Sequence, residues 1–296
     1  MVSGILSGFI SAILMSGSYI FSRTYLRKYQ DPVKLAVFSQ INMGILGIFL
    51  LGLSFFCVEV DVPGRFYLYL TGETFSFLIA QTSFFLMLRK VEATRVASLL
   101  GLKLVVVALF TVLLGNHLFH LQWLAIILCT IAAVGMNFSG GKIPLSSVFW
   151  LIMAVSFYAF CDICITGMMQ IMPGKSMLLN SFFVMGCTFT GIGVLVLPGL
   201  FKYPLTLSAL KATIPYTLFY FSSMIFLMTC FGLIGVVFGS IIQATRGVIS
   251  VVLGMILLHF GLEKNEPQVP VRIWIRRIVM SILMFFAIIL YTLVIQ

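Results

Sequence analysis

The sequence predicts an all-α integral membrane protein with ten transmembrane helices, arranged as two inverted five-helix repeats. Three observations lead to this fold class. The chain of 296 residues is 61% hydrophobic and 9% charged, with a mean hydropathy of +1.17, which no soluble domain approaches. Long apolar segments follow one another with only short polar breaks between them. The two halves of the chain also resemble each other at an offset of about 140 residues.

The first repeat, residues 1–142, holds five apolar segments of roughly 19–25 residues, each long enough to cross about 30 Å of hydrocarbon. We predict spans at 4–22, 33–57, 66–88, 96–114 and 121–139. Pro32 and Pro63 fall in the first two connections, where helices are expected to stop. No basic stretch precedes the first span and no small-residue cleavage site follows it, so we expect a retained helix and not a signal peptide.

The second repeat, residues 143–296, has the same number of segments. We predict spans at 146–169, 177–198, 213–231, 239–260 and 274–295. Prolines again mark the connections, at Pro144, Pro173, Pro204, Pro267 and Pro270. Because the connections are short, consecutive helices must be antiparallel neighbours.

The repeat itself is read from three pairs of corresponding positions. Tyr19 in the first span corresponds to Tyr158 in the sixth, and Met43-Gly44 corresponds to Met185-Gly186. Lys103 in the fourth span corresponds to Arg246 in the ninth, with similar apolar flanks. Because five spans is an odd number, the second half must enter the membrane in the opposite sense. A substrate site is then expected near the midplane, between the halves.

The charges predict an orientation. The net charge of +10 is spread over short connections, so membrane topology explains it better than nucleic-acid binding does. Fourteen cations fall on one side, namely Arg23, Arg27, Lys28, Lys34, Arg89, Lys90, Arg95, Lys142, Lys202, Lys211, Lys264, Arg272, Arg276 and Arg277, whereas only Arg65 and Lys175 fall on the other. By the positive-inside rule the crowded side is cytoplasmic and both termini are outside.

Two cations in mid-span are the leading candidates for substrate binding. A charge at this depth costs roughly 2.5–3.5 kcal/mol on insertion scales, so it is expected to face a cavity or a partner. Arg246 lies on a helical stripe with Gln243 and Ser250, which predicts a cavity wall; a helix-packing stripe is the alternative. The planar guanidinium suits a carboxylate or phosphate. Lys103 is the second candidate, with snorkelling towards an interface as its alternative.

Further candidates are polar residues within other spans. Tyr19, Tyr158, Gln40 and Asn180 are expected to bind substrate, although each amide could simply hydrogen-bond a neighbouring helix. Glu73 and Asp162 are the deep acids. They could carry a coupling proton, hold the cations until substrate displaces them, or form structural ion pairs between helices.

The sequence predicts neither a cofactor nor a metal. His117 and His120 have no third ligand nearby, and the six cysteines fall in apolar segments, where they read as packing residues. No G-x-x-x-x-G-K-[ST] motif is present, so the chain cannot use ATP by that route.

Two stretches resemble known families. Residues 92–100, continuing through 113–117 to 121–123, are similar to the turn between helices 3 and 4, to helix 4 and to the start of helix 5 of EamA-like members of the drug/metabolite transporter superfamily. The chain departs from that pattern at Lys103, where the family commonly has Pro, and at Asn116, where it has Glu. Residues 239–246 resemble helix 9 of nucleotide-sugar and phosphate translocators, which implies a substrate-contacting role for Arg246. The resemblance implies cytoplasmic termini, against the charge count.

Together these features predict a secondary transporter, not an enzyme. We expect it to move a small organic anion or zwitterion, bearing a carboxylate or phosphate, by alternating access, with exchange favoured. A carrier of phospholipid or polyprenyl-phosphate-linked sugar is the alternative, and an intramembrane enzyme using Glu73, Asp162 or Tyr158 is a third. The expected partners are substrate and membrane lipid, with the chain a monomer or homodimer. The expected location is the bacterial inner (plasma) membrane.

Overall fold

The computed structural model describes residues 1–54, 62–88, 99–136, 145–172, 176–259 and 271–295. Within these ranges the chain is helical and no strand occurs. The helices are α1 (Val2–Tyr29), α2 (Pro32–Ser54), α3 (Gly64–Leu88), η1 (Leu100–Leu102), α5 (Lys103–Leu113), α6 (His120–Met136), α7 (Leu145–Ile171), α8 (Met177–Val196), η2 (Leu197–Phe201), α9 (Leu207–Ile234), α10 (Val236–Ala244), α11 (Arg246–His259) and α12 (Val271–Ile295).

Each of the ten predicted spans contains a helix, and the all-α membrane fold is confirmed. Six helices of the described part are long and apolar enough to cross a membrane, and three shorter apolar stretches lie at Leu100–Leu113, His120–Gly135 and Val236–Ile249. The predicted ninth span, 239–260, contains two helices, because Thr245 separates α10 from α11. The predicted start of the span at 213 was late, since α9 begins at Leu207 and includes Pro215.

Local sequence explains where the chain turns. Gln30 ends α1 in a left-handed conformation, with φ of 54°. The Asp31 carboxylate then accepts hydrogen bonds from the backbone N–H groups of Val33 and Lys34, at 3.0 and 3.2 Å, and Pro32 is the first residue of α2. At the other tight turn, Gly235 has φ of 78° and joins α9 directly to α10.

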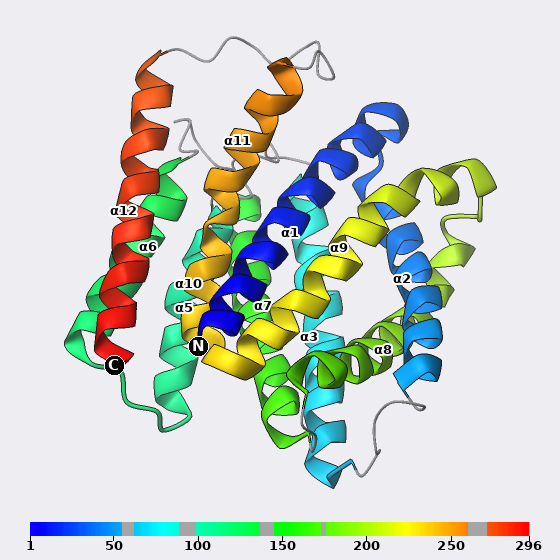
Figure 1. The fold of residues 1–296 in the computed structure, drawn as a ribbon. Coiled ribbons are helices and arrows are strands. Elements are labelled where there is room, and N and C mark those ends of the chain that lie inside the picture. The colour runs from blue at the N-terminus through cyan, green and yellow to red at the C-terminus, as the bar shows by residue number, and fades with distance from the viewer. Residues whose placement is uncertain (55–61, 89–98, 137–144, 173–175, 260–270, 296) are drawn as a thin grey trace.

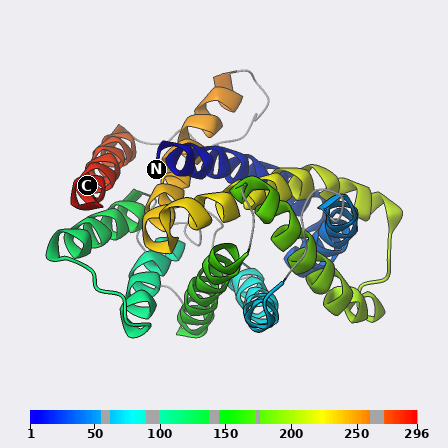
Figure 2. The same cartoon turned by 60° about the horizontal axis from the view of Figure 1, so that its bottom comes forward.

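Helices of the first half pack mainly against helices of the second half. The closest pairings are α1 with α9, α2 with α8, α3 with α7, and α6 with α12, while α5 packs on α7 and α10. Figures 1 and 2 show the α6–α12 pair at one end of the molecule and the α2–α8 pair at the other, with α1, α3, α7 and α9 between them. The space between the halves is therefore lined by helices from both.

Glycines bring α2 and α8 into backbone contact. A Cβ atom built on Gly44 would lie 2.8 Å from the Gly193 Cα, and one on Gly47 would lie 2.8 Å from the Thr190 backbone nitrogen. Small residues at helix crossings are what membrane helices use for close approach, because hydrocarbon offers no hydrophobic drive for association. The close approach of α2 and α8 thus depends on glycines, which have no side chain at the point of contact.

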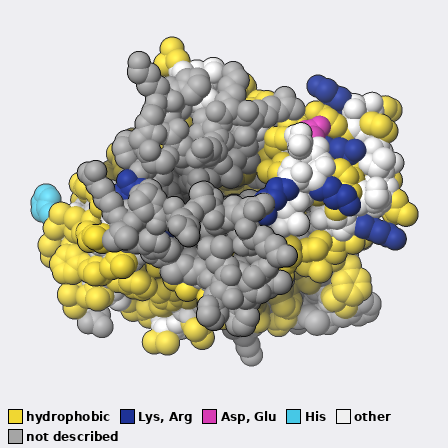
Figure 3. Space-filling view, turned by 90° about the horizontal axis from the view of Figure 1, so that it is seen from above, with side chains coloured by type: hydrophobic (Ala, Val, Ile, Leu, Met, Phe, Trp, Pro, Cys, Tyr) yellow, Lys and Arg dark blue, Asp and Glu magenta, His cyan; other side chains and the backbone are white. Residues whose placement is uncertain are grey.

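Both termini lie beside the α9–α10 turn. A Cβ atom on Gly4 would touch the Ile234 side chain, and the Tyr291 ring stacks on Phe238 with centroids 5.2 Å apart. The exposed cations Arg27 and Lys28 lie at the far end of α1, Lys202 lies in the connection that follows η2, and Lys211 lies near the start of α9. Lys and Arg side chains gather on one part of that face, which Figure 3 shows from above.

Candidate functional site

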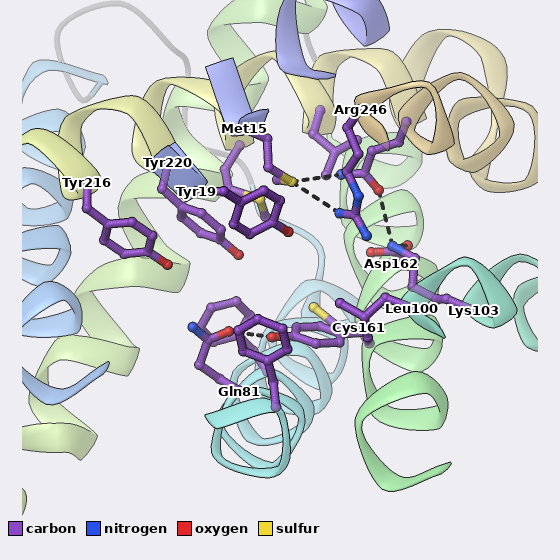
Figure 4. A pocket seen from close by; sticks show the side chains of 16 residues that line it. Met15, Tyr19, Gln81, Leu100, Lys103, Cys161, Asp162, Tyr216, Tyr220 and Arg246 are labelled. Carbon is purple, nitrogen blue, oxygen red and sulfur yellow. Dashed lines mark hydrogen bonds and ion pairs between the residues drawn. The ribbon is translucent and has the colours of Figure 1, made fainter. Parts of the chain in front are cut away.

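A cavity lies between the two halves, walled by residues of α1, α3, α5, α7, α9, α10 and α11. The space between these side chains that no atom fills is about 580 Å³, and part of it is open to solvent. Its charged wall residues are Lys103, Asp162 and Arg246. Figure 4 shows these three on one side of the cavity, with tyrosines from α1 and α9 beside them.

Lys103 is held by two residues of the other half. Its Nζ lies 2.6 Å from the Asp162 Oδ2 on α7, and it donates a hydrogen bond of 3.2 Å to the Gln243 Oε1 on α10. The two charged side chains are 12% and 6% exposed, so this is a buried ion pair. The pairing joins α5 to α7 and α10, and it offsets the cost of placing each charge in the membrane interior.

Arg246 has different neighbours. Its Nη1 points at the Met15 sulfur at 3.3 Å, and its guanidinium carbon lies 6.0 Å from the centre of the Tyr19 ring. A thioether is a weak acceptor and an aromatic face a weak attraction, so both leave most of the five N–H donors available. Among the described residues, no carboxylate lies within ion-pair distance of this guanidinium. Arg246 is therefore the cation of the wall that is not already neutralised.

Aromatic and amide groups make up most of the remaining wall. Tyr216 and Tyr220 stack on each other, with centroids 5.7 Å apart, and Tyr158 donates a hydrogen bond to the Gln81 Oε1. Phe77 packs edge-on against Tyr158, at a centroid separation of 6.4 Å. This part of the wall is mostly aromatic ring surface with a few phenol hydroxyls. The rings suit a ligand with an apolar or aromatic body.

Glu73 lies behind the wall and not on it. It is completely buried, and its Oε1 accepts a hydrogen bond of 3.5 Å from the Cys161 thiol. Its Oε2 has no hydrogen-bond partner among the described residues, and the Thr188 hydroxyl, also unpartnered, lies near this carboxyl. The two acids that the sequence analysis treated together therefore lie in different surroundings. Asp162 faces the cavity, and Glu73 is packed between α3, α7 and α8.

Six of the ten predicted site residues line one cavity: Arg246, Lys103, Gln243, Tyr19, Tyr158 and Asp162. Two predicted amides lie elsewhere. Gln40 sits on α2 with both amide atoms buried and unpartnered in the described structure, and Asn180 donates a long hydrogen bond of 3.5 Å to the Met172 carbonyl near the α7–α8 connection. Ser250 belongs to α11, but its side chain lies outside the described residues.

Sequence reasoning missed several wall residues, chiefly Met15, Gln81, Tyr216 and Tyr220. Tyr216 and Tyr220 are four apart on one helix, a spacing that the sequence shows. In an apolar span, however, such a pair is as typical of helix packing as of a cavity, and only the arrangement of helices separates the two.

The fold is that of a multi-pass integral membrane protein with a cavity between its two halves. Residues 2–138 match the sequence profile of the EamA-like transporter family, which confirms the predicted resemblance. The match to this family implies a membrane transporter of small molecules. No curated protein matches the sequence. A solved crystal structure of a protein shares the fold, with a TM-score of 0.69 and 12% identity over 99% of this chain and 98% of that one.

Proposed function

We propose that this transporter carries a small organic anion, bearing a carboxylate or a phosphate, and that Arg246 binds the anionic group. The observation that carries the proposal is the Arg246 guanidinium, which lines the cavity without a carboxylate partner among the described residues. A half-buried cation at membrane depth with free donors is unfavourable unless a ligand supplies the counter-charge. The guanidinium fork also fits a carboxylate or phosphate in two parallel hydrogen bonds.

The arrangement of helices supports transport by alternating access. The pairings α1–α9 and α3–α7 exchange with each other when the first half is swapped for the second, and α2–α8, α5–α10 and α6–α12 each map onto themselves. This is the pattern expected of two related halves around a shared site. The cavity between them would open to either side as one half rocks against the other.

The charge on the wall supports exchange over uniport. Returning an empty cavity across the membrane would move its unbalanced cation through hydrocarbon, which is unfavourable. A bound anion removes most of that cost. We therefore infer that the carrier changes from one open side to the other more readily with substrate bound, which makes it an antiporter. We also propose that it resides in a plasma membrane.

The test is binding followed by counterflow. Purified protein is first screened by thermal shift against organic anions and zwitterions, because a ligand present at 100 times its dissociation constant adds about 2.7 kcal/mol of apparent stability. Proteoliposomes loaded with each hit are then offered the labelled compound outside. Uptake that depends on internal anion supports exchange. Stabilisation and transport confined to a labelled phospholipid would instead assign the carrier to lipid.

A further inference from the structure

We infer that the Lys103–Asp162 ion pair determines which substrate charge the site accepts, and that it restricts the substrate to a single negative charge. The inference rests on the proposed anion transport and deepens it. Two cations and one carboxylate face the cavity, so the described wall carries one net positive charge. A monoanion neutralises that charge, whereas a dianion leaves a negative charge unmatched in a site of low dielectric.

The geometry gives Asp162 this role. Its Oδ2 lies 2.6 Å from the Lys103 Nζ, so the carboxylate occupies the place on Lys103 that a second anionic group of a substrate would need. The pair is fixed further by Gln243, whose Oε1 accepts a hydrogen bond from the same ammonium group. Asp162 thus acts as a built-in counter-ion for one of the two cations.

Arg246 completes the argument because its neighbours are neutral. Met15 and Tyr19 contact the guanidinium, and neither carries a charge. Asp162 lies close enough to Arg246 to influence it electrostatically, yet its ion-pair contact is with Lys103. Glu73 is separated from the cavity by Cys161, which lines the wall and donates to the Glu73 carboxyl.

This narrows the substrate class. At neutral pH a monocarboxylate or a phosphodiester carries one negative charge, and a phosphate monoester carries about 1.5 to 2. The wall therefore favours a monocarboxylate or a phosphodiester over a phosphate monoester or a dicarboxylate. The tyrosine wall favours an apolar or aromatic body on that anion.

The experiment measures the ratio of dissociation constants for phenylacetate and phenylmalonate, which differ by one carboxylate, by calorimetry on purified protein. We expect the wild type to prefer phenylacetate. Asp162→Asn frees Lys103 and should shift the ratio towards phenylmalonate on the order of tenfold or more. The double variant Lys103→Gln/Asp162→Asn removes one charge of each sign, and we expect it to return to the wild-type preference. Arg65→Gln, on an exposed residue at the start of α3, is the control.

The outcomes separate this inference from the proposed function. A folded Asp162→Asn variant that keeps the wild-type ratio would overturn the valence role while leaving anion transport intact. An equal shift in Glu73→Gln would assign the counter-charge to Glu73 and also overturn it. If Asp162→Asn does not fold, the double variant decides, because a preference for phenylmalonate there contradicts the charge argument. A wild type that binds neither compound nor any other organic anion would remove the proposed function itself.

Discussion

Lys103 and Arg246 are each the first residue of an α-helix that continues an irregular turn inside an apolar segment. Lys103 follows the 3₁₀ turn η1, and Arg246 follows Thr245, whose backbone N–H donates to the Ile242 carbonyl at 3.0 Å. Tight turns of this kind keep backbone groups hydrogen-bonded, which hydrocarbon requires. The two positions that the predicted repeat aligns thus share both the cation and the irregularity.

Replacing Arg246 should weaken anion binding far more than stability. We expect Arg246→Ala to cost about 2–4 kcal/mol of binding, roughly 30- to 1000-fold in the dissociation constant, because a charge-assisted partner is lost in a dry site. Arg246→Lys keeps the charge but loses the fork, so its loss should be smaller. Calorimetry with the tightest anion of the screen checks both variants.

The matched control for Arg246 is Arg65→Ala, since Arg65 is exposed and does not line the cavity. Its affinity should equal that of the wild type. Arg246→Ala protein that is well folded and binds the anion with wild-type affinity would sink the proposed role of Arg246.

The Lys103–Asp162 pair should be coupled in stability. Lys103→Gln or Asp162→Asn alone leaves a buried charge without its partner, so each should lower the unfolding free energy by about 3–5 kcal/mol. The double amide variant should recover most of that loss, because no unpaired charge remains. Thermal denaturation of the four proteins forms a double-mutant cycle. Additive losses would show that the two side chains do not stabilise each other. The control is Lys211→Gln, on an exposed residue, which should change the unfolding free energy little.

Glu73 tests whether transport is coupled to protons. The carboxyl is completely buried, and Cys161 and Thr188, which lie near it, are uncharged, so among the described residues an ionised form has no cation as its partner. If this group binds and releases a proton in each cycle, Glu73→Gln should abolish uptake driven by a pH gradient and leave counterflow intact. Proteoliposomes with and without an imposed gradient separate the two readouts. Unchanged pH dependence in both Glu73→Gln and Asp162→Asn would leave the acids as structural residues.

The sequence predicted the fold because hydropathy and proline placement act locally. Each of the ten spans contains a helix, and the deep cations stood out since a charge in an apolar span is costly wherever the helix packs. The break at Thr245 was not predicted, because Thr245 has ordinary helical dihedrals and neither glycine nor proline marks it.

The site was predictable only in part. Residues that differ chemically from their span, such as Lys103 and Asp162, were found, whereas Tyr216 and Tyr220 look like packing aromatics until α9 is placed beside α1. Gln40 and Asn180 show the converse. Their polarity marked them as candidates, yet neither side chain lines the cavity, because each helix places it elsewhere in the packing.

The orientation prediction follows from the position of the termini. Both lie beside the α9–α10 turn (Figure 1). The exposed cations Arg27 and Lys28 lie at the far end of α1, and Lys202 and Lys211 lie before and near the start of α9. If the cation-rich side faces the cytoplasm, the C-terminus lies outside it. A phosphatase fused after Gln296 should then be active, and a fluorescent protein fused at the same position should be dark. Fluorescence without phosphatase activity would place both termini in the cytoplasm.

The α2–α8 crossing gives a stability prediction with a control on the same helix. A Cβ atom on Gly44 would lie 2.8 Å from the Gly193 Cα, and because that neighbour is backbone it cannot move aside without separating the helices. We expect Gly44→Ala to destabilise the protein by about 1–3 kcal/mol, the usual cost of overpacking. Gly52 has nothing within 4 Å of its Cβ position, so Gly52→Ala should be neutral or stabilise α2 by about 0.5–1 kcal/mol through its lower unfolded-state entropy. Thermal denaturation compares the two directly, and a loss in Gly52→Ala as large as that in Gly44→Ala would show that backbone contact at the crossing is not the cause.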